Sequence, residues 1–270
     1  MQDGATGQIL GKLDQVVQEA LRKNDRIGYF AAFNHRLVRE VEIAIERGYF
    51  VDAERTAALL KALSCRYLDA LGSYRQENGL ARCWRSAFQA TRSKRFIILQ
   101  HLLLALNAHV NLDLGIAVNR VAPTPARLKE IEEDYRRLRR ILQEMVAQVQ
   151  RRIVVISPWI GLLDRLGQRR KERFILFSTR AAGRAAWKVA KDLSTLNSQQ
   201  QRELLRSLDG VVLASQRRLE GRKLHVRCAL WLIRRKESRD VRANIRFLLE
   251  GFGTEPGDAV QSLLSRPGSR

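Results

Sequence analysis

The residues best suited to chemistry lie in one apolar stretch, residues 96–118, where His101, His109 and Asp113 stand among Leu, Ile, Val and Ala residues. At ~100° per helical residue, setting His101 at 0° puts His109 at about 80° and Asp113 at about 120°. The three side chains therefore share one face of the expected helix. Because imidazole and carboxylate groups suit Zn, Fe or Mn, this face predicts a divalent metal site with His101, His109 and Asp113 as ligands.

A second polar stripe, formed by Gln100, Asn107 and Asn111, falls on the other side of the same helix. A helix this apolar belongs inside a protein, and a buried polar group without a partner costs about 1–3 kcal/mol. Asn107 and Asn111 are thus candidates for orienting a substrate or cofactor beside the metal ligands.

Three interpretations of these residues stay open. The first is the metal site, although His101 and His109 lie about 12 Å apart along the axis at ~1.5 Å per residue, and the spacing matches neither Glu-x-x-His nor His-Glu-x-x-His. The second is a metal-free ligand or catalytic pocket. The third is a polar network that only specifies packing, with His109 paired to Asp113 along the helix.

Weaker candidates lie outside this stretch. Asn34 points inward from the apolar stripe of its helix, and His35 falls at the edge of that stripe. Asp69 lies opposite the apolar stripe of the helix that follows Asp52, so we expect it to be solvated. The three cysteines lack ligand spacing and are expected to fill the core; these are Cys65, Cys83 and Cys228.

Helical periodicity runs through the whole chain, and no alternating strand pattern persists. Gly48 is a natural helix stop, Asp52 and Thr124 suit N-caps, and Pro125 suits a first helical position. The sequence predicts one all-α, bundle-like domain of about eight to ten helices over residues 1–250, with a central buried helix at about 96–118. Residues 251–270 are expected to be a mostly irregular tail.

The chain is strongly basic, with a formal net charge of +21 among 270 residues. Residues 136–200 hold 15 basic and 4 acidic side chains, and Arg136, Arg137, Arg139 and Arg140 line the outer face of the helix that begins near Pro125. A basic face of this kind attracts nucleic acid or anionic lipid, so a polyanion partner at 136–200 is one expectation. An arginine-rich composition without a binding role is the other.

The stretch 96–118 is long enough to span a bilayer, but its amides, imidazoles and carboxylate oppose insertion. We therefore expect a buried helix and no membrane span. The first residues lack the pattern of a secretory signal, and three cysteines without C-x-x-C spacing suit a reducing compartment. The sequence favours a cytoplasmic location.

Several segments resemble one uncharacterised bacterial family, catalogued as domain of unknown function 5995. They are IGYFAAFNHRLVREV, RYLDAL, CWRSAF, LQHLLLALNAHVNLDLGIA, VISPWIGLLDRLG and FSTRAAGRAAW, within residues 9–190. The resemblance implies an all-α fold and assigns no activity and no catalytic residue. His101, Asn107, His109, Asn111 and Asp113 lie in its most specific stretch.

Two functions follow as hypotheses. One is a divalent-metal-dependent enzyme built around the buried His, Asp and Asn side chains, with the metal activating water or polarising a substrate. The other is a non-enzymatic basic module that binds a polyanion or protein partner, its buried polar residues serving only the fold. No G-x-S-x-G elbow, P-loop or strand-linked G-x-G-x-x-G occurs in the sequence.

Overall fold

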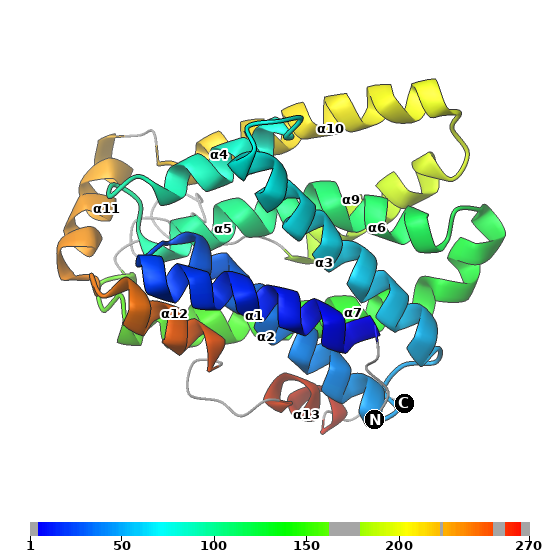
Figure 1. Cartoon of the computed structure of the whole chain (residues 1–270), viewed down its shortest axis with the longest axis horizontal. Helices are drawn as coiled ribbons and strands as arrows, with labels where there is room; N and C mark the ends of the chain where they lie inside the picture. Colours follow the sequence, from blue (N-terminus) through cyan, green and yellow to red (C-terminus); the bar gives the residue numbers. More distant parts are fainter. Residues whose placement is uncertain (1–4, 162–178, 222–223, 251–256, 266–270) are drawn as a thin grey trace.

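A computed structural model describes residues 5–161, 179–221, 224–250 and 257–265. Within these ranges every regular element is helical, which confirms the all-α prediction (Figure 1). The elements are α1 (Ala5–Lys23), α2 (Ile27–Glu46), α3 (Ala53–Arg75), α4 (Arg82–Thr91), α5 (Ile98–Ala108), the π-helical turn η1 (His109–Asp113), α6 (Leu114–Val121), α7 (Pro125–Arg152), the 3-10 turn η2 (Ile153–Val155), α9 (Thr179–Leu193), α10 (Ser198–Leu219), α11 (Leu224–Lys236), α12 (Val241–Leu249) and α13 (Asp258–Leu264).

The elements α5, η1 and α6 form one continuous rod at the centre of the molecule (Figure 1). The rod is apolar enough to span a membrane by composition, yet 89% of its most apolar window is buried inside the fold. It packs against α2, α3, α4, α9 and α10. The central buried helix predicted at 96–118 is therefore confirmed, with observed bounds of Ile98 and Val121.

The predicted helix signals act as expected. Asp52 caps α3 by accepting a hydrogen bond from Arg55 N at 2.8 Å, and Thr124 caps α7 by accepting from Arg127 N at 3.3 Å. Gly48 follows α2 with a φ of +66°, a conformation that favours glycine. These local signals fix where the surrounding helices begin and end, and so which of their side chains face the rod.

The tail expected to be irregular contains α13, which packs against α2 and α7. Gly257 N donates to Glu40 Oε1 at 2.9 Å, and Glu40 is itself paired with Arg36 at 2.8 Å. Glu40 and Gly257 are more than 200 residues apart in sequence, so local periodicity could not indicate the contact between them. Residues 251–256 and 266–270 of the same tail lie outside the described residues.

Candidate functional site

The carboxylate of Asp113 lies at the centre of a buried polar cluster. Its side chain is fully buried, Arg66 Nε donates to Oδ1 at 2.7 Å, and Trp84 Nε1 donates to Oδ2 at 2.8 Å. The donors come from α3 and α4, which flank the rod. A buried carboxylate needs such compensation, because charge-assisted hydrogen bonds offset part of the cost of leaving water. Both oxygens of Asp113 are thus occupied within the protein.

His109 is packed beside this carboxylate without being hydrogen bonded to it. Its Nδ1 lies 3.8 Å from Asp113 Oδ2, which is too long for a hydrogen bond. The ring packs edge-on against Phe30 and Trp84, with centroid distances of 5.3 and 6.3 Å. Neither ring nitrogen has a hydrogen-bond partner in the described part of the chain. His109 is the least satisfied polar group of the cluster.

The pair sits on the π-helical turn η1, which runs from His109 to Asp113. A π-helical turn is wider than an α-helical turn, and such turns occur often at functional sites. The sequence pattern assumed a regular α-helix throughout this stretch. The shared face of His109 and Asp113 is retained, but direct pairing between them is not formed.

His101 lies in a different environment from His109. Its ring packs against Tyr29 and Phe96, at 5.8 and 6.0 Å. It borders a cavity of about 10 Å³, room for about one water, that is also lined by Glu237 and Arg234. Burial, with a smaller effect from the charges of Arg26 and Arg234, lowers the pKa of His101 to about 3.

The predicted metal ligands are therefore divided between two places. No group of three or more His, Cys, Asp or Glu side chains is placed to hold a metal ion among the described residues. His109 and Asp113 stay together, while His101 faces its own small cavity. The three-ligand arrangement expected for His101, His109 and Asp113 is not formed in this structure.

Glu237 is a polar core residue that sequence reasoning missed. Both of its carboxylate oxygens lie 3.1 Å from Ile98 N, the first backbone amide of α5. Burial raises the pKa of Glu237 to about 7, against the lowering effect of the Ile98 hydrogen bond. The only signal in the sequence was the lack of a capping side chain at Ile97, which leaves the amides at the start of α5 in need of an acceptor.

The second polar stripe binds α10. Asn107 exchanges hydrogen bonds with Ser215 at 2.9 and 3.2 Å, and Gln100 Nε2 donates to Leu219 O at 2.8 Å. In the other direction, Gln216 Nε2 of α10 donates a hydrogen bond to Leu104 O at 2.8 Å. Asn111 is only half-buried. These contacts agree with the third interpretation of the sequence, a polar network that specifies packing. They place Asn107 at the interface between the central rod and α10.

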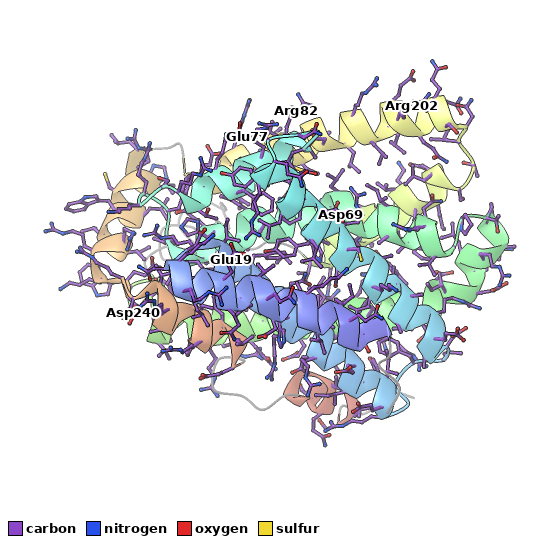
Figure 2. The ribbon with its side chains drawn as sticks, viewed as in Figure 1. Glu19, Asp69, Glu77, Arg82, Arg202 and Asp240 are labelled. Atoms are coloured by element: carbon purple, nitrogen blue, oxygen red, sulfur yellow. The ribbon has the colours of Figure 1, made fainter. Side chains whose placement is uncertain are left out.

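The weaker candidates follow their predicted positions, except for one cysteine. Asn34 is buried with both amide atoms unpartnered among the described residues, and His35 is half-buried. Asp69 is exposed on α3 (Figure 2). Cys83 is buried as expected, but Cys228 is exposed on α11, so its expected place in the core was wrong. The periodicity of α11 is obscured by apolar residues on its outer side.

Two larger openings than the cavity beside His101 lie in other parts of the described structure. A polar groove of about 260 Å³ runs between α1, α3 and α4 and is lined by Glu19, Arg75 and Glu77, among others. Glu19 and Glu77 are labelled in Figure 2. Its charges are partly neutralised, since Glu19 pairs with Lys23 at 2.7 Å and with Arg75 at 2.8 Å. An apolar cavity of about 20 Å³ lies beside Phe33 and Leu102. Neither opening is lined by His109 or Asp113.

The fold and this cluster define an all-helical domain whose central rod carries a buried carboxylate that is hydrogen bonded to two neighbouring helices. A family model described as a family of unknown function, DUF5995, matches residues 6–220, and the chain belongs to this family. The match confirms the resemblance drawn from the sequence. No curated protein and no solved structure matches the chain.

Proposed function

We propose that this protein is a binding module that associates with a polyanion through exposed arginine and lysine side chains. In this proposal the polar side chains along the central rod stabilise the fold. The contacts of Asp113, Asn107 and Gln100 with neighbouring helices support the second half of the proposal. The charge distribution on the surface supports the first half.

The arginines of α7 are poorer candidates for polyanion binding than the sequence suggested. Arg136 pairs with Glu132 at 2.6 Å and with Glu133 at 3.4 Å, and Arg137 pairs with Glu133 at 3.1 Å. Such intrahelical pairs neutralise part of the face. Residues 162–178 of the predicted 136–200 face lie outside the described residues.

A more strongly basic surface lies at the end of the molecule that carries α11, which we call the basic end. Arg234 Nε donates to Lys94 O at 3.0 Å and so joins the loop before α5 to α11. The nearby carboxylate of Glu237 is buried and points to the start of α5. We define the basic end by its exposed cations Lys94, Arg95, Arg227, Arg235, Lys236 and Arg239, none of which forms an ion pair with a described residue.

This unneutralised cluster is the observation that carries the proposal, because unpaired surface cations attract anionic polymers and release their counterions on binding. Titration of the protein into fluorescein-labelled heparin tests it by fluorescence anisotropy. We expect binding at ~50 mM salt that weakens steeply toward ~200 mM. A variant with Lys94→Gln, Arg95→Gln and Arg239→Gln binds more weakly, while Arg202→Gln with Arg206→Gln on α10 changes little. Absence of binding at ~50 mM salt contradicts the proposal.

A divalent-metal-dependent enzyme is the second candidate, and the unpartnered nitrogens of His109 beside Asp113 favour it. In that case Zn, Fe or Mn would bind at His109 and Asp113, with Asp113 exchanging its bond to Arg66 or Trp84 for the metal. Elemental analysis of protein purified without an affinity tag tests this function. About one equivalent of metal that is lost in His109→Ala supports it, and metal well below one equivalent in both proteins removes it.

A further inference from the structure

The outer face of α11 exposes large apolar side chains between basic ones. Leu224 is 74% exposed, Trp231 57% and Leu232 37%. The opposite face, which includes Val226 and Ile233, is buried against the core. At ~100° per residue, Leu224, Trp231 and Arg235 fall within about 40° of one another on the outward side. The helix thus has two apolar faces, and only one of them is covered.

A neighbouring segment extends this apolar surface. Ser238 N donates to Ile156 O at 2.8 Å, which holds the segment after α7 beside the end of α11. Trp159 on this segment is 44% exposed, and the ammonium of Lys236 lies 5.9 Å from its ring centroid. We call the set formed by Leu224, Arg227, Trp231, Leu232, Arg235, Lys236 and Trp159 the α11 surface.

Exposed apolar side chains are concentrated in this part of the molecule. Among the described residues, large exposed hydrophobic side chains occur at Val51, Val154, Val155, Trp159, Val211, Leu224, Trp231, Leu232 and Leu264. Six of these nine lie on α11 or on the segment 154–159 next to it, and the others are scattered over α10, α13 and the loop before α3. Single exposed hydrophobics are ordinary, whereas a group marks an interaction surface.

The chemistry of the α11 surface favours lipid over nucleic acid. Bases bind to aromatic side chains by stacking on an open ring face, but the guanidinium of Arg235 lies 4.8 Å from the Trp231 centroid and Lys236 lies over Trp159. Leu224 and Leu232 offer no stacking face at all. Tryptophan, leucine and flanking basic residues together are typical of helices that lie at a membrane interface. Figure 1 shows α11 at one edge of the molecule, where no described helix lies outside it.

We propose that the α11 surface docks on an anionic lipid membrane, with Trp159, Trp231 and Leu224 entering the interface and Arg227, Arg235 and Lys236 binding lipid phosphates and carboxylates. This inference rests on the proposed function and names its polyanion. The expected cytoplasmic location suits it, because the cytoplasmic leaflet carries anionic lipids.

The test is sedimentation of the full chain with vesicles of phosphatidylcholine containing ~30% phosphatidylserine, against vesicles of phosphatidylcholine alone. We expect binding only to the anionic vesicles. A variant with Trp231→Ala and Leu224→Ala lowers the partition coefficient about tenfold or more, and Arg227→Gln with Arg235→Gln lowers it about fivefold per charge. The matched control is Val51→Ala with Val211→Ala. These two valines are about as exposed as Leu224 and Trp231 but lie on other surfaces, so we expect the control to leave vesicle binding unchanged.

A second measurement tests whether the tryptophan side chains enter the membrane interface. Brominated phosphatidylcholine in the anionic vesicles quenches the fluorescence of indoles that enter the interface, so the wild-type protein is quenched more strongly than Trp231→Ala. Labelled heparin is titrated in parallel. Heparin binding without vesicle binding overturns the lipid inference and leaves the proposed function standing, whereas loss of both contradicts both. Vesicle binding that is unchanged in the Trp231→Ala, Leu224→Ala variant also overturns the inference.

Discussion

Trp84 Nε1 donates a hydrogen bond of 2.8 Å to Asp113 Oδ2 in the interior of the protein, where the carboxylate is fully buried. Trp84→Phe removes this donor while keeping an aromatic ring in place. Because hydrogen bonds to charged groups contribute about 1.5–3 kcal/mol, we expect the free energy of unfolding to fall by about that amount in urea titrations. Asp69→Asn, an exposed change on α3, is the control and shifts stability by less than about 0.5 kcal/mol. Equal stability of Trp84→Phe and wild type would show that this bond is not formed.

Close packing between α6 and α9 gives a second prediction. A Cβ at Gly115 would lie 2.7 Å from Ala186 O and 2.9 Å from Val189 Cβ, whereas a Cβ at Gly72 in α3 meets nothing within 4 Å. Gly115→Ala therefore destabilises the protein by about 1–3 kcal/mol through overpacking. Gly72→Ala stabilises it by about 0.5–1 kcal/mol, because alanine is the better helix former. Thermal and urea unfolding of the two variants measure both effects, and the same sign in both would contradict this account of the interface.

Much of this architecture could be predicted from the sequence, because it depends on local signals. Periodicity, the caps at Asp52 and Thr124, and the apolar run around His101 are all read within a few residues. The partners of Asp113 could not be predicted, since Arg66 and Trp84 come from other helices and only tertiary packing brings them to it. The π-helical turn at His109 was also missed, because an apolar run reads the same at either helical pitch.

The raised pKa of Glu237 predicts how stability changes at acidic pH. Burial raises this pKa from 4.5 to about 7, so the folded state binds a proton that the unfolded state has already released. The contribution of protonated Glu237 to the free energy of unfolding is present below pH ~4.5. It is lost at up to about 1.4 kcal/mol per pH unit as pH rises toward 7. Glu237→Gln removes this slope. Urea unfolding at a series of pH values measures it, and the same pH dependence in wild type and variant would contradict the assignment.

His101, which lines the same small cavity as Glu237, gives the free energy of unfolding the opposite dependence on pH. Its pKa is lowered from 6.5 to about 3 by burial, helped by Arg26 and Arg234, so the unfolded state takes up a proton first as pH falls. Stability from His101 is present above pH ~6.5 and is lost toward pH 3, at up to about 1.4 kcal/mol per pH unit. His101→Phe keeps an aromatic ring beside Tyr29 and Phe96 and abolishes this loss. An acid-unfolding profile that is unchanged in His101→Phe would place the titrating group elsewhere.

The central claim is that the buried polar cluster serves the fold while binding belongs to the basic end. The most direct test is the affinity of folded Asp113→Asn for labelled heparin, measured by anisotropy at ~50 mM salt. We expect a less stable protein whose affinity stays within about twofold of wild type, because Asp113 is fully buried against Arg66 and Trp84 and lies outside the basic end. Loss of heparin affinity in Asp113→Asn that is still folded by circular dichroism would place the binding function in the core and contradict the claim.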